Sequence, residues 1–215
     1  MPRPFRSPAR RGCVLEPRLP GSGLPFYRRL RLEPLEDRRL LAAVTVGNLN
    51  DIVDGDVTSI AALIGTPGAD GVSLREAILA ANADAAADTI DFAVTGTIQL
   101  TNVGHAGELA ITKSITIDGP GASLLMIRAY AGTTTSGNGS RLFRIDDGAA
   151  TLKDVFVGGL TFTGGDRTSL SDGADGGAII NSENLTLTGC TISGNQLSGS
   201  GGRGVASLVN SVVLP

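Results

Sequence analysis

The most regular feature of the chain is a set of short runs in which apolar and polar residues alternate. These runs lie at residues 96–100, 109–111, 114–119 and 142–145, and similar runs continue through the last third of the sequence. Alternation with a period of two places every second side chain on the same face of a β-strand. Strands this short do not form a stable pair alone. The pattern therefore predicts many short strands that stack on neighbouring strands.

The last third of the chain also repeats itself. Residues 160–165 are echoed by residues 191–195 when Phe162 is set against Ile192, an offset of 30 residues. One full repeat contains three short runs, at residues 176–181, 184–188 and 191–195. Three strands joined by Gly or Asn turns, with no helix between them, do not form a βαβ sheet. The sequence therefore predicts a parallel β-helix of about four coils, with three strands in each coil.

The alternation also assigns the side chains of one coil to the inside or the outside. Four apolar residues are predicted to point inward and to stack on neighbouring coils, namely Ile179, Leu185, Leu187 and Ile192. Four hydroxyl-bearing residues are predicted to point outward, namely Thr186, Thr188, Thr191 and Ser193. Gly194 and Asn195 are expected to form a corner, because both residue types tolerate a positive φ.

One α-helix is predicted ahead of this repetitive body, after a first short strand at residues 44–46. Ser73 and Glu76 have the spacing of a capping box, in which each side chain bonds to the backbone N–H of the other residue. An apolar stripe with helical spacing follows, formed by Leu74, Ala77, Ile78 and Ala81. The helix is expected to begin after Ser73 and to end near Asn82. Because the cap explains this spacing, Arg75 and Glu76 are interpreted as structural and not catalytic.

Composition agrees with an all-β chain. Gly accounts for 30 of the 215 residues and aromatic residues for only 4%. This composition favours strands joined by tight turns over a helical bundle, and the length suits one folded unit.

The first 43 residues have a different character from the rest. They carry ten Arg against four acidic residues, whereas the remaining residues carry eight basic and seventeen acidic side chains. Seven Pro residues interrupt this basic segment, and such a sequence cannot bury enough apolar surface to become ordered. We expect a disordered leader that serves as a targeting segment, and no binding of nucleic acid.

The acidic residues after the first strand, Asp51, Asp54 and Asp56, lack the spacing of a helix-loop-helix calcium site and are expected to lie in a solvated loop. The two cysteines, Cys13 and Cys190, match no zinc or redox spacing, and Cys190 is expected to be a buried or half-buried free thiol. The sequence contains no apolar run long enough for a transmembrane helix.

Three segments resemble known families. Residues 73–78, 81–82 and 88–92 together resemble the CSLREA-type N-terminal region of bacterial β-helix surface proteins, with Val72 in place of the leading Cys of that family. Residues 176–181, 185–188 and 190–195 resemble the repeats of polymorphic outer-membrane-protein-like β-helices. Residues 32–42 resemble the LEPR-x-LL type segment of large surface or secreted proteins of planctomycete bacteria.

These resemblances imply a right-handed parallel β-helix with a short N-terminal capping α-helix. They also imply export to the cell surface, in association with an outer membrane, or to the extracellular space. The expected organisation is a disordered basic leader over residues 1–43, an N-terminal strand and helical cap over 44–100, and β-helix coils over 101–215. The last coil is expected to lack a cap, which would favour edge-to-edge self-association.

An enzyme of the β-helix class needs acids, or acids with Arg or Lys, that project from one face of successive coils. The candidates are Asp146, Asp147, Asp154, Asp166, Asp172 and Asp175, with Arg144, Lys153 and Arg167 near them. Most are expected in loops, and those from Asp166 to Asp175 in a solvated Gly/Ser insertion. The one His, His105, lies in a predicted surface turn. We therefore assign no catalytic, cofactor-binding or metal-binding residue.

The sequence thus favours an exported, adhesin-like scaffold without catalysis, with polysaccharide or extracellular matrix as its partner. Two alternatives stay open. One is a fragment of a β-helix polysaccharide lyase or glycoside hydrolase, and the other is a purely structural surface spacer. Convergence of acids from different coils on one groove would favour an enzyme.

Overall fold

The computed structural model describes residues 42–84, 86–101, 107–132, 139–168, 176–198, 206–208 and 211–215. The chain divides into two units, Met1–Arg38 and Arg39–Pro215, and all the described residues belong to the second unit. Several residues discussed above lie outside the described residues, namely 1–41 of the predicted leader with Cys13, and also His105, Asp172 and Asp175.

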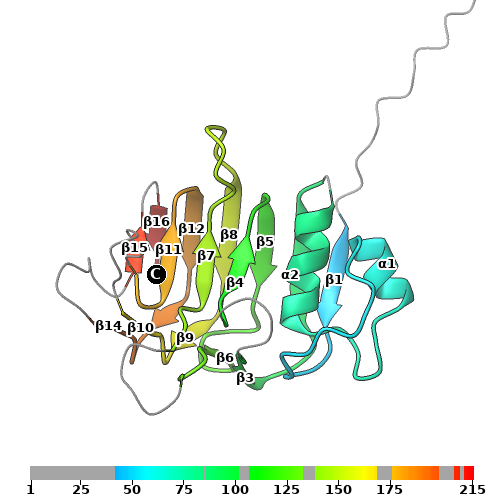
Figure 1. The fold of residues 1–215 in the computed structure, drawn as a ribbon, viewed down its shortest axis with the longest axis horizontal. Coiled ribbons are helices and arrows are strands. Elements are labelled where there is room, and N and C mark those ends of the chain that lie inside the picture. The colour runs from blue at the N-terminus through cyan, green and yellow to red at the C-terminus, as the bar shows by residue number, and fades with distance from the viewer. Residues whose placement is uncertain are drawn as a thin grey trace, which may run out of the picture. The chain divides into compact units, whose positions relative to one another are not determined.

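The described part of the chain is mainly β, with strands in parallel sheets and few helices (Figure 1). The largest sheet, sheet A, contains in spatial order β1 (Ala43–Val46), β2 (Asp88–Phe92), β5 (Ile115–Asp118), β8 (Asp154–Gly158), β12 (Asn184–Thr188) and β16 (Ser211–Leu214). Sheet B contains β3 (Gly96–Gln99), β6 (Leu125–Arg128), β9 (Thr161–Thr163) and β13 (Thr191–Ile192).

Two further sheets complete the arrangement. Sheet C contains β4 (Leu109–Ile111), β7 (Phe143–Ile145), β11 (Ile179–Asn181) and β15 (Ala206–Leu208). A two-stranded sheet pairs β10 (Asp166–Thr168) with β14 (Gln196–Ser198). Strand pairs in all four sheets are parallel.

The chain visits sheets A, B and C in the same order several times. The strands β2, β3 and β4 make the first passage, and β5, β6 and β7 make the second. The third and fourth passages add β10 and β14 between sheets B and C. We call each passage a repeat. Each strand pairs with the strand of the same sheet in the next repeat, so strands distant in sequence are neighbours.

The predicted pairing of Phe162 with Ile192 is confirmed, because the two residues are in register between β9 and β13. The same offset of 30 residues brings Asn184 beside Asp154, where the two side chains form a hydrogen bond. Between β5 and β8 the offset is 40 residues, because the segments that separate β5 from β6 and β7 from β8 are longer than their counterparts in the next repeat. Because the loops differ in length, the repeat has no constant period in the middle of the sequence and cannot be recognised there.

The inward and outward assignments are confirmed for most of the residues named above. Ile179, Leu185 and Leu187 are buried, while Ile192 is partly buried and packs against the core. Outside, Thr188, Thr191 and Ser193 are exposed and Thr186 is half-buried. Gly194 has a φ of +64°, as expected for a corner.

The predicted helix is confirmed as α2 (Leu74–Ala83), which contacts β1 and β4 (Figure 1). The capping box is complete, since the Ser73 hydroxyl accepts from the Glu76 N–H and the Glu76 carboxylate accepts from the Ser73 N–H. A second helix, α1 (Ile60–Gly65), was not predicted. Its sequence signal is Ser59, which caps the helix immediately before an apolar run.

The prediction that Asp51 is solvated is wrong. Its carboxylate is buried and forms two hydrogen bonds with the guanidinium of Arg75, at 2.7 and 2.9 Å. The backbone N–H and the hydroxyl of Thr101 also donate to it. Its partners are distant in sequence, so local composition could not reveal them. Asp56, in contrast, is exposed and bonds to Thr58.

The interpretation of Asp166 as part of a solvated insertion is also wrong. Asp166 is buried at the start of β10, where it pairs in register with Gln196. The segment has few apolar residues, and its strand forms because β14 in the next repeat supplies a hydrogen-bonding partner. Strands β2, β6, β8, β14 and β16 are likewise absent from the predicted set.

Across the described residues, neither helix is long and apolar enough to cross a membrane.

Candidate functional site

Two of the predicted candidates, Asp147 and Lys153, meet at the turn between sheets C and A. The Lys153 ammonium lies 2.9 Å from the Asp147 carboxylate, and both residues belong to the loop between β7 and β8. Glu183, which is buried in the next repeat, accepts from the backbone N–H groups of Asp147 and Lys153. We call Asp147, Lys153 and Glu183 the loop-anchoring cluster, because each of its bonds holds this loop in place.

The protonation states in this cluster follow from its hydrogen bonds. The bond from Lys153 is the main cause that lowers the pKa of Asp147 below its ordinary value. The bond to Asp147 likewise raises the pKa of Lys153 above its ordinary value. Both groups are therefore held in their charged forms, which suits an ion pair and not the transfer of a proton.

The remaining candidates do not join this cluster. Arg144 and Asp146 form an exposed pair at 3.5 Å, and Asp154 accepts a hydrogen bond from Asn184 on the face of sheet A. Asp166 is buried in the separate β10–β14 sheet, and Arg167 follows it in that strand. The predicted candidate acids that the structure describes therefore do not converge on one groove. Among the described residues, no three His, Cys, Asp or Glu side chains gather closely enough to hold a metal ion.

Cys190 is half-buried, as predicted. Its sulfur lies 3.5 Å from the backbone oxygens of Val157 and Thr188. Burial raises the pKa of the thiol above its ordinary value, so that less of the reactive thiolate forms at neutral pH.

The outer face of sheet A carries a site that the sequence analysis missed. In β8, Val155 and Val157 point into the core, so Phe156 between them points outward and is 49% exposed. Its neighbours in register are Thr116 on β5 and Thr186 on β12. A phenyl ring therefore lies between two threonines on the surface.

A groove lies next to this ring. Two residues further along the same three strands, the row in register is Asp118, Gly158 and Thr188. Because Gly158 has no side chain, the row is hollow at its centre. The groove has a volume of about 300 Å³, and its lining includes Thr116, Asp118, Phe156, Gly158 and Thr188. We call it the sheet A groove.

The sheet A groove is negatively charged. Asp118 is exposed, and its carboxylate forms no ion pair or hydrogen bond within the described part of the chain. Asp154 lies at the start of β8 on the same face. The described strands β1, β2, β5, β8 and β12 contain no Lys or Arg. The face therefore favours a neutral or cationic ligand over a polyanion.

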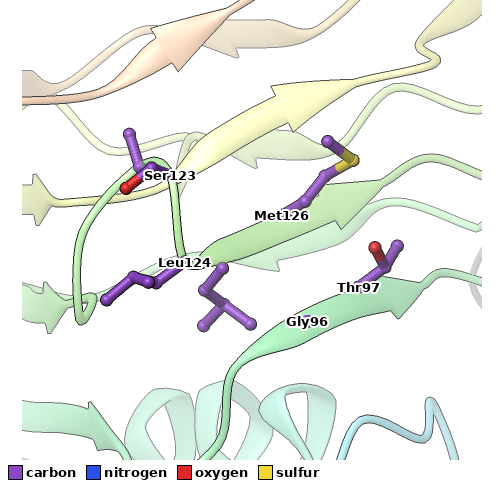
Figure 2. Close-up of a pocket in the computed structure, with 7 residues that line it drawn as sticks. Gly96, Thr97, Ser123, Leu124 and Met126 are labelled. Carbon is purple, nitrogen blue, oxygen red and sulfur yellow. The ribbon is translucent and has the colours of Figure 1, made fainter.

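A second groove, of about 250 Å³, lies on sheet B. Figure 2 shows Thr97 on β3 beside Met126 on β6, with Ser123 and Leu124 in the turn that precedes β6. Leu124 is 51% exposed. This groove is lined without ionisable or aromatic side chains, so it offers little to orient a polar ligand.

Comparisons with protein-family models, with curated proteins and with solved structures each find no match to this chain.

Proposed function

We propose that this chain is an exported scaffold, located at the cell surface or outside the cell, that adheres to polysaccharide. We further propose that its body is a right-handed parallel β-helix. The observation that carries the proposal is the repeated passage of the chain through three parallel sheets, which leaves on sheet A an outward face of hydroxyl, amide and carboxylate groups.

The strand order supports the β-helix. Each strand pairs in parallel with the strand of the same sheet in the next repeat, and the described residues from β2 onward contain no helix. Connections between parallel strands of one sheet are right-handed in nearly all proteins, which supports the proposed hand.

The outer face of sheet A supports adhesion. Thr116, Thr186 and Thr188 offer hydroxyl groups and Asn184 an amide, and all of them lie on adjacent or nearby strands of one sheet. Groups repeated along a stack of parallel strands match the repeated hydroxyl groups of a polysaccharide. The exposed ring of Phe156 adds an apolar surface beside them.

The loop-anchoring cluster supports adhesion over catalysis. A lyase or hydrolase needs acidic or basic groups that are free to act on a substrate. Here Asp147 and Lys153 pair with each other, and Glu183 bonds to the backbone of the loop that carries them. Lyases of acidic polysaccharides also need positive charge beside the substrate, and the sheet A groove carries negative charge.

The proposal of export comes from the leader. Its residues 32–42 resemble the N-terminal segment of planctomycete surface and secreted proteins. The strongly basic composition of residues 1–43 agrees with a targeting segment.

The adhesive function can be tested by sedimenting the full chain with insoluble polysaccharides and by assaying the same samples for soluble products. We expect the protein to sediment with at least one neutral or amino-sugar polysaccharide and to release no reducing ends or unsaturated sugars. Turnover of a polysaccharide would instead support the enzyme alternative. Failure to sediment with any of them would leave the scaffold without its adhesive role.

A further inference from the structure

We propose that the sheet A groove is a subsite for one amino-sugar residue of a polysaccharide. In this subsite the sugar ring stacks on Phe156, its ammonium group pairs with Asp118, and its hydroxyl groups bond to the neighbouring threonines. This inference rests on the proposed adhesive function, because it specifies where the polysaccharide binds and which sugar is selected.

The exposure of Phe156 is the first argument. Two other described phenylalanines, Phe143 and Phe162, are fully buried and contact each other in the core. Phe156 instead keeps 49% of its surface exposed, between Thr116 and Thr186 of the two neighbouring strands. The face of an aromatic ring is electron-rich and attracts the C–H groups of a sugar ring, so a stacked sugar would cover this apolar surface.

Gly158 provides the second argument. It lies in a strand, where a β-branched residue would be favoured, and its backbone does not require a positive φ. A Cβ atom at this position would lie 3.7 Å from its nearest neighbours, the Asp118 carboxylate and the Thr188 backbone oxygen, which is an ordinary contact. Packing therefore does not require Gly at this position, and its effect is to keep the groove open.

Asp118 provides the third argument, because its charge selects the ligand. Its carboxylate is in register with Gly158 and lies at the edge of the groove. It has no partner among the described residues. An ammonium group would supply the opposite charge, whereas the carboxylate of a uronic acid would be repelled.

The dimensions agree with one sugar. Adjacent strands are about 4.8 Å apart, so the three strands β5, β8 and β12 span about 10 Å. The ring of Phe156 lies on the central strand, with hydroxyl groups of Thr116 and Thr186 on either side. One pyranose ring and its substituents fit this width.

The test uses the full chain and isothermal titration with three soluble oligosaccharides, namely oligomers of glucosamine, N-acetylglucosamine and galacturonic acid. We expect the glucosamine oligomer to bind most tightly and the galacturonate oligomer least tightly. F156A and G158T should each weaken glucosamine binding at least tenfold, the first by removing the stacking surface and the second by filling the groove. D118N should remove most of the preference for glucosamine over N-acetylglucosamine.

The control variant is L124A, which removes an apolar side chain of similar exposure, 51%, from the sheet B groove. It should bind as the unchanged protein does. Circular dichroism of each variant establishes that it is folded, and G158T is well suited to a strand.

The outcomes separate this inference from the proposed function. Binding of oligosaccharides that F156A and G158T leave unchanged would overturn the subsite and leave the adhesive function standing. Tighter binding of galacturonate than of glucosamine would overturn the proposed selectivity. Absence of binding to any of the three, in a protein that sediments with insoluble polysaccharide, would also overturn the subsite.

Discussion

The buried pair of Asp51 and Arg75 joins the segment after β1 to helix α2 and to the first repeat. The two side chains are only 1% and 3% exposed. Arg75 also donates to the backbone oxygens of Gly107 and Glu108, just before β4. One guanidinium therefore connects three segments, and its removal would leave a buried carboxylate with fewer donors.

We predict that R75M destabilises the protein by about 3–5 kcal/mol, because it breaks a buried ion pair from one side. Urea unfolding followed by circular dichroism measures this change. The matched control is R144M, since Arg144 forms an exposed pair with Asp146 at 3.5 Å. That change should cost at most about 1 kcal/mol. Equal effects of the two variants would contradict the assigned role of Arg75.

Asp88 is a second buried acid, and its environment disfavours the charge. Burial is the main cause that raises its pKa above the ordinary value, and the nearby charge of Asp84 raises it further. The backbone N–H of Ala42 donates to one carboxylate oxygen. The other oxygen is buried without a hydrogen-bond partner among the described residues. The folded state therefore binds a proton at Asp88 more tightly than the unfolded state does.

This raised pKa predicts how stability depends on pH. The contribution of Asp88 is most favourable below 3.8, the ordinary pKa of an aspartate, and is lost as the pH rises through its folded-state pKa. D88N should therefore unfold at a higher temperature than the unchanged protein at pH 7. The difference should shrink or reverse below pH 3.8. A lower melting temperature of D88N at pH 7 would show that the ionised carboxylate is stabilising.

At the scale of single elements, two glycines occupy equivalent turns from sheet A to sheet B. Gly159 follows β8 with a φ of +60°, and Gly189 follows β12 with a φ of +57°. A Cβ atom on Gly159 would lie 2.5 Å from the backbone oxygen of Gly119 in the preceding repeat. The same atom on Gly189 would meet nothing within 4 Å. The two positions thus differ in packing and not in backbone conformation.

We predict that G189A costs about 1–2 kcal/mol, the ordinary strain of a non-glycine residue in the left-handed region. G159A should cost about 1–3 kcal/mol more, because the added methyl group must displace the backbone of the preceding repeat. Parallel urea titrations of the two variants give the difference directly. Equal costs would mean that the repeats are not packed in the register described.

The sequence predicted those elements whose signals are local. The capping box of α2 spans only four residues, and the alternating runs of β4, β5 and β12 are equally local. These elements could therefore be predicted from the sequence. Helix α1 has a weaker signal, a single cap before a six-residue helix. Strands β10 and β14 carry little apolar pattern, and their pairing with each other across 30 residues makes them strands.

The candidate site could not be predicted for a related reason. Val155, Phe156 and Val157 form an unbroken apolar run, so the sequence does not show which of them faces outward. The pairing of Phe156 with Thr116 and Thr186 determines that Phe156 faces outward. This pairing depends on the offset of 40 residues between β5 and β8 and on the offset of 30 residues between β8 and β12. Asp147 and Lys153, which the sequence analysis considered as catalytic candidates, instead anchor a loop.

At the scale of the whole molecule, the stacking of repeats can be tested with pairs of introduced cysteines. Asp154 and Asn184 are in register on adjacent strands, at the spacing of about 4.8 Å that permits a disulfide. With Cys13 and Cys190 changed to Ser, D154C/N184C should form a disulfide on mild oxidation. T116C/T186C should not, because β8 lies between those strands and separates them by about 10 Å. The reverse result would contradict the strand order.

The basic leader and the acidic body of the chain differ in charge, and this difference suggests separate roles for the two parts. Residues 1–43 carry ten Arg, whereas the remaining residues are mostly acidic. A basic leader can be read by an export system, and an acidic body resists nonspecific binding to nucleic acid. The proposed adhesive role of the sheet A groove requires that the body reaches the outside of the cell.

The proposal of export is therefore tested most directly by the location of the protein in expressing cells. The full chain is compared with a form that lacks residues 1–41, a deletion that spares Ala42 and its hydrogen bond to Asp88. Added protease should digest the full chain on intact cells, or the protein should be found in the medium, while the shortened form stays protected inside. Protection of both forms inside the cell would contradict the proposal of an exported surface scaffold.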